Sequence, residues 1–221
     1  MKCDLFQVYG LTETAGAITI LMPEDHDPKK GKLRSCGKAL SSVEIKVVDD
    51  EGNEVKTGDI GEVISKSPLN MKGYWNRPDA TEEAIKEGWF YSGDAGFFDD
   101  EGYLYIHDRV KDMIVSGGEN IYPAEVENAL MSHPEIADAA VIGVPDDKWG
   151  ESVKGFVVLQ PDSSLDETEI ISYSRTQIAG YKCPKTINFI EALPRNPSGK
   201  ILRRELREPF WEGKDRMVSG N

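Results

Sequence analysis

The chain has 221 residues, of which 39% are hydrophobic and 29% are charged, and its formal net charge is −13. This length allows one large hydrophobic core or two small ones, and the composition is that of an ordinary globular protein. No apolar run approaches the ~20 residues of a membrane span. The acidic balance also disfavours nonspecific binding to nucleic acids. The sequence therefore predicts a folded protein without a transmembrane segment or a nucleic-acid partner.

Cysteine usage bears on the compartment. Cys3, Cys36 and Cys183 are scattered along the chain without a C-x-x-C pair. This spacing argues against a disulfide scaffold or a zinc site and fits a reducing environment. The first residues also lack the apolar core of a secretory signal. We therefore expect a cytoplasmic protein.

The first half of the chain has the pattern of a β-rich unit. Alternating or aromatic segments predict strands at residues 6–9, 43–48, 53–56, 61–66, 89–91 and 102–106. The tetrapeptide D-D-E-G occurs twice, at 49–52 and 99–102, where it suits hairpin turns. A short helix is expected at 81–86, with Thr81 as its N-cap. Strands at this spacing indicate a small antiparallel, barrel-like subdomain.

The strand at residues 6–9 is expected to be buried. A buried strand needs neighbours on both sides, and none is expected N-terminal to it. We therefore expect the chain to be part of a larger protein.

The second half alternates between strand and helix patterns. Helices are expected at 124–131, 166–179 and 201–207, and strands at 136–144, 153–159 and 186–190. Pro123 suits the first position of the first helix. The pattern predicts a compact α+β unit of about a hundred residues, enough for its own core. The predicted fold is mixed α/β, with a barrel-like subdomain followed by this unit.

Residues 109–123, R-V-K-D-M-I-V-S-G-G-E-N-I-Y-P, join the two halves. A charged segment is followed by a short apolar run and then by a turn. Gly117 and Gly118 allow a positive φ or a close approach of a ligand in that turn. On local chemistry alone, a linker followed by a Gly-Gly hairpin is the simplest interpretation.

Two short segments have the residue types of a nucleotide site. Y-G-L-T-E at 9–13 follows a strand, so Thr12 could bond to a phosphate and Glu13 could ligate Mg²⁺. The alternative is an ordinary helix N-cap. Asp94 follows Ser-Gly in an expected turn, where its carboxylate could accept hydrogen bonds from both ribose hydroxyls. The alternative is an Asx-turn residue.

The C-terminal part carries a basic cluster, which runs against the overall charge. Its members are Arg195, Lys200, Arg203, Arg204 and Arg207. They could form an anion site or a solvated helix face. Lys200 lies in a loop bounded by Pro197 and Gly199, and such a loop can deliver one cation to a developing negative charge. A surface lysine in a turn is the alternative.

Five motifs in this order resemble the adenylate-forming superfamily, which includes acyl-CoA synthetases, adenylation domains of peptide synthetases and luciferases. They are Y-G-L-T-E (9–13), Y-S-G-D (91–94), D-R-V-K-D-M-I-V-S-G-G-E-N-I-Y-P-A-E-V-E (108–127), V-P-D-D-K-W-G-E (144–151) and P-R-N-P-S-G-K-I-L-R-R-E-L (194–206). The wording S-G-G-E-N-I-Y-P is most similar to fatty acyl-CoA synthetases and related carboxylic acid–CoA ligases.

The resemblance implies a reaction in two steps. A carboxylic acid, with a fatty acid as the expected class, is joined to AMP with loss of pyrophosphate. The acyl group then passes to the thiol of coenzyme A. ATP, Mg²⁺ and coenzyme A are the implied cofactors and partners.

The resemblance also implies roles for residues of the first step. Tyr9 would pack on adenine beside Gly10, Thr12 would contact phosphate and Glu13 would ligate Mg²⁺. Asp94 and Arg109 would bind the ribose. Lys200 would bridge the carboxylate and the phosphate.

For the second step, the implied hinge is Lys111 and the implied coenzyme residues are Gly117, Gly118 and Trp149. Cys183 stands where some relatives carry a basic residue for coenzyme A phosphate. Lys182 is the expected substitute, and Lys185 is a second candidate.

The resemblance covers the C-terminal part of such an enzyme, and its N-terminal phosphate loop is absent. The implied division is 1–36 as a remnant of the large domain, 37–108 as the β-rich subdomain, 109–112 as the hinge, 113–210 as a mobile domain and 211–221 as a tail. We therefore expect that the chain alone cannot adenylate. A noncatalytic interaction module and an adenylation partner of a carrier protein are the alternatives, and a homodimer is left open.

Overall fold

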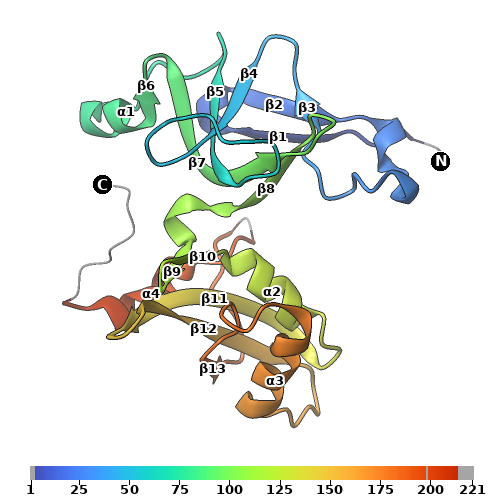
Figure 1. The fold of residues 1–221 in the computed structure, drawn as a ribbon, viewed down its shortest axis with the longest axis vertical. Coiled ribbons are helices and arrows are strands. Elements are labelled where there is room, and N and C mark those ends of the chain that lie inside the picture. The colour runs from blue at the N-terminus through green and yellow to red at the C-terminus, as the bar shows by residue number, and fades with distance from the viewer. Residues whose placement is uncertain (1–2, 198, 214–221) are drawn as a thin grey trace. The chain divides into compact units, whose positions relative to one another are not determined.

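The computed structural model describes residues 3–197 and 199–213 (Figure 1). The chain divides into two compact units, Met1–Val110 and Lys111–Asn221. Both contain sheets with antiparallel strand pairs, and in the second unit helices pack against both faces of the sheet. The predicted mixed α/β class is therefore confirmed. None of the helices in the described ranges is long and apolar enough to span a membrane.

The first unit is built from two antiparallel sheets. One contains β1 (Gln7–Leu11), β2 (Gly16–Leu21) and β3 (Lys38–Ala39). The other contains β4 (Glu44–Val48), β5 (Gly61–Lys66), β7 (Trp89–Phe98) and β6 (Ile85–Lys86) in this order, with β8 (Leu104–Arg109) also paired to β7. Short helices are η1 (Thr12–Thr14), η2 (Pro23–His26), η3 (Pro28–Lys30) and α1 (Pro78–Ala84). Val47, Val63 and Leu104 form its buried core.

Two expectations about strands in this unit are wrong. Residues 53–56 make only the single bridge Val48–Glu54. The expected turn at 92–94 lies inside β7, where the Ser92 hydroxyl donates to the Val63 carbonyl of β5 at 2.6 Å. Gly93 has a φ of +69°, which lets the strand continue through an irregular position. Asp94 is therefore a strand residue, and it pairs with Arg109 of the neighbouring strand β8.

The expected helix start at Thr81 is also wrong. Helix α1 begins at Pro78, because proline has no N–H to leave unbonded and its φ suits a first turn. Thr81 lies one turn inside the helix. Its hydroxyl donates to the Arg77 carbonyl at 2.7 Å and accepts from the Tyr74 N–H at 2.9 Å. It thus joins the helix to the preceding loop instead of capping it.

Strand β1 is not buried in this structure. It lies at the edge of its sheet, paired with β2. Leu5, Phe6 and Val8 beside and within it are 63%, 51% and 56% exposed. The burial expected from its apolar sequence is therefore wrong for the described residues.

The second unit has a sheet covered by helices, as expected of the predicted α+β unit. Its sheet has the order β10 (Glu119–Ile121), β9 (Ile114–Ser116), β12 (Gly150–Leu159) and β11 (Ile136–Asp146). Strand β13 (Thr186–Phe189) runs parallel to β12, and the other pairs are antiparallel. The helices are η4 (Val110–Asp112), α2 (Pro123–Met131), α3 (Glu167–Gln177) and α4 (Arg203–Trp211).

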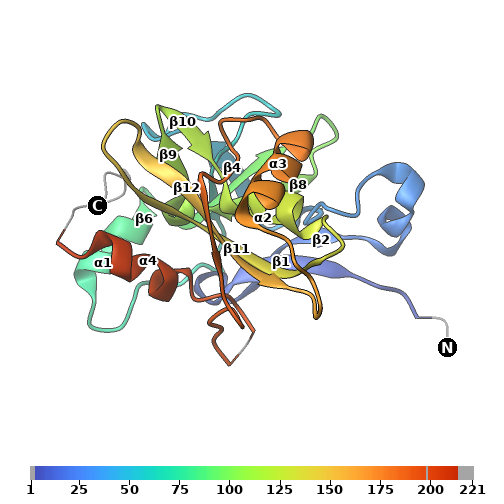
Figure 2. The same ribbon diagram turned by 90° about the horizontal axis from the view of Figure 1, so that it is seen from below.

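Two apolar clusters lie on opposite faces of this sheet. Ala139 and Val141 of β11 belong to one cluster, and Ala140 and Ile142 belong to the other. This alternation follows from the two-residue period of a strand. Helices α2 and α3 cover the first face, and α4 covers the second through Leu206 and Phe210 (Figure 2).

Helix α2 begins at Pro123, as predicted. Helix α4 begins at Arg203, two residues later than expected. The difference has a physical reason: Ile201 instead makes a bridge with Arg195.

Candidate functional site

The Asp94 carboxylate is the centre of a polar cluster in the first unit. Asp94 is only 6% exposed. Its Oδ1 accepts from Arg109 Nη1 at 2.8 Å, and its Oδ2 accepts from the Tyr9 hydroxyl at 2.7 Å. Its own N–H donates to the Ser92 hydroxyl at 3.0 Å. Strands β1, β7 and β8 thus bring together three residues that are separated by up to a hundred positions along the sequence.

This arrangement leaves acceptor capacity on Asp94. A carboxylate offers about four lone-pair positions. Arg109 and Tyr9 occupy one on each oxygen. Burial, and then the negative charge of Asp94, raise the pKa of the Tyr9 hydroxyl, so this group remains a donor at neutral pH. A diol could therefore still donate one hydrogen bond to each oxygen.

Gly10, Thr12 and Glu13 follow Tyr9 at the end of β1. Any side chain at Gly10 would collide with the Gly16 carbonyl, so the close pairing of β1 and β2 already requires a glycine. Thr12 is exposed and starts η1. Glu13 is half-buried, and its Oε1 accepts from the Tyr74 hydroxyl at 2.9 Å. The sequence interpretation did not include this tyrosine.

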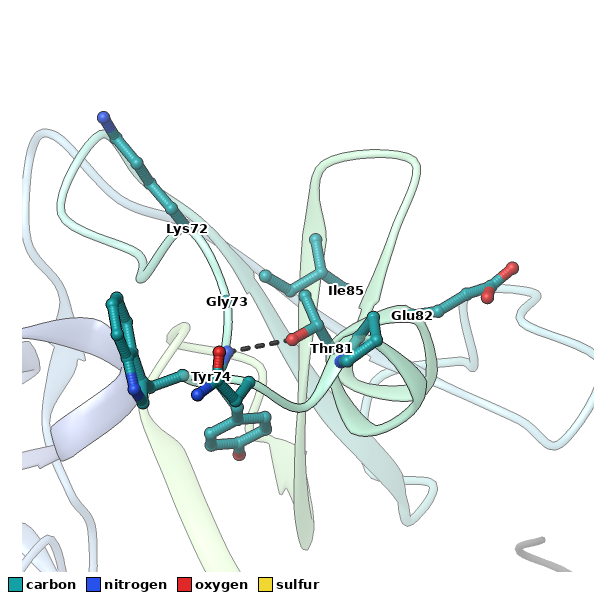
Figure 3. A pocket seen from close by; sticks show the side chains of 9 residues that line it. Lys72, Gly73, Tyr74, Thr81, Glu82 and Ile85 are labelled. Carbon is teal, nitrogen blue, oxygen red and sulfur yellow. Dashed lines mark hydrogen bonds between the residues drawn. The ribbon is translucent and has the colours of Figure 1, made fainter.

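An open hollow of about 690 Å³ lies next to Tyr74 (Figure 3). Lys72, Gly73 and Trp75 are among the residues that line it. Trp75 is 90% exposed. Hydrogen bonds from Tyr74 to Glu13, and from the Met71 N–H to the Glu13 carbonyl at 2.7 Å, tie this wall to the Y-G-L-T-E segment.

In the second unit, Gly117 and Gly118 form the turn between β9 and β10. Their φ values are +63° and +86°. The Gly117 N–H donates to the Trp149 carbonyl at 2.8 Å. A Cβ at Gly117 would lie 2.7 Å from the Trp149 ring, whereas one at Gly118 would meet nothing within 4 Å. The predicted hairpin is therefore present, and only Gly117 is required by contact with Trp149.

The turn that carries Trp149 is ordered by Asp146. The N–H groups of Lys148 and Trp149 both donate to Asp146 Oδ1 at 3.0 Å and hold the pKa of that carboxyl below its usual range. Trp149 is 41% exposed. The ammonium groups of Lys148 and Lys185 lie 4.5 Å and 5.0 Å from its ring centroid. An exposed aromatic ring is thus flanked by two cations.

Lys182, the residue expected at a coenzyme phosphate, forms an ion pair within the second unit. Its ammonium donates to both carboxylate oxygens of Glu125 at 2.7 Å. The neighbouring Cys183 is buried. Binding of a phosphate to Lys182 would require that this ion pair break or be shared.

Lys200 lies in a loop whose base is fixed. Arg195 donates to the Gly199 carbonyl and to Asp138 of β11, both at 2.6 Å. The Asn196 side chain accepts from the Lys200 N–H at 2.9 Å, and the Asn196 N–H donates to the Lys200 carbonyl. Within residues 3–197 and 199–213, the Lys200 ammonium makes no hydrogen bond or ion pair. The loop therefore presents one exposed cation.

The surrounding arginines do not form an open anion site. Arg203 pairs with Glu127, Arg207 with Asp112 and Arg204 with Glu208. Arg203 and Arg207 are also too buried for the alternative of a solvated face, since their side chains are 18% and 17% exposed. Arg195, Arg203 and Arg207 thus pair with acids far away in sequence, while Arg204 pairs with the nearby Glu208 and is exposed. Neither interpretation describes the cluster as a whole.

Two models of enzyme families match this chain. The model described as AMP-binding enzyme matches residues 1–75, and the model of the AMP-binding enzyme C-terminal domain matches residues 125–200. The chain belongs to the AMP-binding, adenylate-forming enzymes.

Curated AMP-binding relatives are similar over nearly the whole chain. A fatty acid–[acyl-carrier-protein] ligase, ScoC of Streptomyces coeruleorubidus, is 44% identical over 99% of this chain and 42% of its own length. A long-chain-fatty-acid–CoA ligase of Escherichia coli O6:H1 is 48% identical over 92% of this chain and 36% of its own length. The chain thus spans about two-fifths of the length of these relatives.

Solved AMP-binding enzymes have the same fold. The o-succinylbenzoate-CoA synthetase MenE of Bacillus subtilis, in complex with its acyl-adenylate intermediate, matches with a TM-score of 0.83 and 44% identity. The match covers 91% of this chain and 40% of that one.

The described residues of this AMP-binding chain provide few ligands for a magnesium ion. Among the described residues, no group of three or more His, Cys, Asp or Glu side chains could hold a metal. Mg²⁺ at nucleotide sites is commonly held by one or two carboxylates together with phosphates and water. Glu13 bonds to Tyr74 through Oε1. A single carboxylate therefore fits a metal whose other ligands come from the nucleotide and from water.

Proposed function

We propose that this chain supplies nucleotide, adenylation and thiol-transfer residues to an ATP-dependent carboxylic acid–CoA ligase. The observation that carries the proposal is the buried Asp94 carboxylate, held by Arg109 and Tyr9 with acceptor capacity to spare. This is the arrangement that a ribose diol needs. Family membership supports the same reading.

In the adenylation step, an acid carboxylate attacks the α-phosphate of ATP, and pyrophosphate leaves. Negative charge develops on the phosphate and carboxylate oxygens. We assign Lys200 to these oxygens, because a single exposed cation on a fixed loop can stabilise them. Thr12 would bond to phosphate, and Glu13 would hold Mg²⁺, which supplies further positive charge when bound. MenE has itself been solved with ATP and a magnesium ion.

In the second step, the thiol of coenzyme A attacks the acyl carbon, and AMP leaves. We assign the Gly117–Gly118 turn to the path of the pantetheine arm, because Trp149 packs against Gly117 while the space beside Gly118 is open. We propose Lys111 as the pivot that exchanges the two steps. This assignment is supported by the division of the chain into units immediately before Lys111.

A fatty acid is the proposed acid, and coenzyme A is the proposed acceptor. The Escherichia coli and Streptomyces relatives are named for fatty acids, and the former is named for coenzyme A. Transfer to a carrier protein is the second candidate, because ScoC is named for that acceptor. The cytoplasmic location, the homodimer and the finer division of the chain stay predictions.

The function is tested by a ligase chimera, in which this chain replaces the matching segment of the Escherichia coli ligase. We expect acid-dependent ATP–pyrophosphate exchange by the chimera and none by the isolated 221-residue chain, which lacks the expected phosphate loop. A folded chimera without exchange would refute the proposed function. Exchange by the isolated chain would refute only its expected inactivity.

Coenzyme A binding separates the candidate lysines. We expect Lys185→Ala to weaken binding of coenzyme A to the chain about tenfold, because an ammonium–phosphate bond contributes about 1.5–3 kcal/mol. Lys182→Ala should have a smaller effect, because Lys182 already pairs with Glu125. Calorimetric titration measures both. Lys46, which lies 5.2 Å from the Trp89 ring in the other unit, provides a matched control in Lys46→Ala. A larger effect of Lys182→Ala would contradict the expectation that Lys185 contributes more than Lys182 to binding of the coenzyme phosphate.

A further inference from the structure

Four charged side chains of the second unit have no role in the proposed chemistry. They are Asp112 of η4, Glu127 of α2, and Arg203 and Arg207 of α4. Arg207 Nη2 donates to Asp112 Oδ1 at 2.6 Å, and Arg203 Nη1 lies 3.7 Å from Asp112 Oδ2. Arg203 also donates to both oxygens of Glu127, at 3.1 Å and 2.7 Å. We call these four residues the arginine clamp.

The clamp is largely removed from water. Its side chains are between 11% and 18% exposed. Burying charges is expensive even when they are paired, and apolar residues of similar size often stabilise a fold as well or better. Helix α4 is also held by Leu206 and Phe210 and by a hydrogen bond from Trp211 to the Gly143 carbonyl. The clamp is therefore a costly addition to a helix that is already packed.

The positions of the clamp residues along the chain indicate which segments the clamp connects. Asp112 directly follows Lys111, where the second unit begins. Arg203 is the third residue after Lys200. In some proteins, ion pairs with a defined geometry fix two segments relative to one another more specifically than apolar contact does. The clamp thus joins the start of the unit to the helix that follows the Lys200 loop.

We propose that Asp112, Arg203 and Arg207 are positioning residues, which hold the Lys200 loop in a fixed place relative to the first residues of the second unit. This inference rests on the proposed function in one respect. If Lys111 is the pivot, the Lys200 loop moves together with Lys111 as one rigid body. The upstream side of the loop is already fixed by Arg195 and Asp138. The clamp fixes its downstream side.

Fixing the loop on both its upstream and its downstream side restricts the positions that the Lys200 side chain can take. A long side chain on a mobile loop samples many positions, and ordering it at each turnover costs conformational entropy. A catalytic group held within a fraction of an ångström of its working position avoids part of that cost. Glu127 contributes by holding Arg203 and by accepting from the Val141 N–H at 2.8 Å, which ties the clamp to β11.

Amide hydrogen exchange on the 221-residue chain tests this inference without substrates. The Lys200 N–H bonds to Asn196, and the Leu202 N–H bonds to the Pro194 carbonyl, so both amides report on the loop. In Asp112→Asn we expect these two amides to exchange about tenfold faster, with little change at Val153 and Val157 in the core strand β12. Arg204→Ala, on the exposed side of the same helix, should change neither group.

Three further variants separate positioning from general stability. Phe210→Ala removes apolar packing of α4 and should accelerate exchange throughout the unit. Arg207→Lys keeps a cation and should accelerate loop exchange less than Arg207→Ala. Uniform acceleration in Asp112→Asn, like that of Phe210→Ala, or no acceleration at all, would overturn the inference. These results do not depend on activity, so an inactive ligase chimera would refute the proposed function and leave the outcome for the clamp standing.

Discussion

Lys200→Ala in the ligase chimera is expected to lower acid-dependent ATP–pyrophosphate exchange by about 10²–10³-fold, the range found when one group that stabilises transition-state charge is removed. Transfer of a preformed acyl-adenylate to coenzyme A should be almost unchanged. The reason is that, in the proposed exchange about Lys111, Lys200 has left the site before the thiol attacks, so it stabilises charge only in the first step. The expected loss is therefore confined to one half-reaction.

In this structure, Lys200→Ala removes the ammonium group without removing a contact that holds the loop. The Lys200 ammonium has no hydrogen-bond or ion-pair partner among the described residues, so its removal leaves no buried charge behind. The loop is held by its backbone and by Arg195 and Asn196, which the substitution leaves in place. Arg204→Ala is the matched control, since Arg204 is an exposed cation four residues away. Equal loss of both half-reactions would contradict the assigned role of Lys200.

Asp94→Asn is expected to raise the KM for ATP about tenfold or more and to reduce discrimination against 2′-deoxy-ATP and 3′-deoxy-ATP. An amide has one acceptor oxygen where the carboxylate has two, so it cannot accept from Arg109, Tyr9 and a ribose diol together. The chain should also lose about 1–3 kcal/mol of stability. The lower end is favoured, because the Arg109 side chain is 43% exposed and can be solvated.

The control for this substitution is Glu62→Gln. Burial raises the pKa of the Glu62 carboxyl, which accepts from the Gly93 N–H at 2.8 Å, next to Asp94. An amide oxygen can still accept that bond, so discrimination between ATP and its deoxy analogues should be kept. Steady-state kinetics of both variants in the ligase chimera, with ATP, 2′-deoxy-ATP and 3′-deoxy-ATP, measures this discrimination. Unchanged discrimination in Asp94→Asn would contradict the ribose assignment.

Features that depend on short stretches of sequence could be predicted. The Gly117–Gly118 turn followed by a helix at Pro123 follows from the conformations that glycine and proline favour. The alternation of helix and strand after residue 113 follows from the spacing of apolar residues.

Features that depend on distant partners could not be predicted. Arg207 and Asp112 are 95 residues apart, and no local pattern indicates that they pair. The Tyr9–Asp94 bond spans 85 residues in the same way. Asp94 was expected in a turn because Ser-Gly-Asp favours turns, yet pairing with β5 and β8 keeps it in a strand. Tertiary pairing overrides local preference at this position.

The central claim is that this one chain carries residues for two successive half-reactions. A single-turnover experiment on the ligase chimera, with radiolabelled fatty acid, tests it most directly. Without coenzyme A we predict that labelled acyl-adenylate accumulates on the enzyme. When coenzyme A is added, this pool should convert to acyl-CoA with release of AMP. Formation of acyl-CoA without any acyl-adenylate, or an accumulated acyl-adenylate that coenzyme A cannot discharge, would contradict the account.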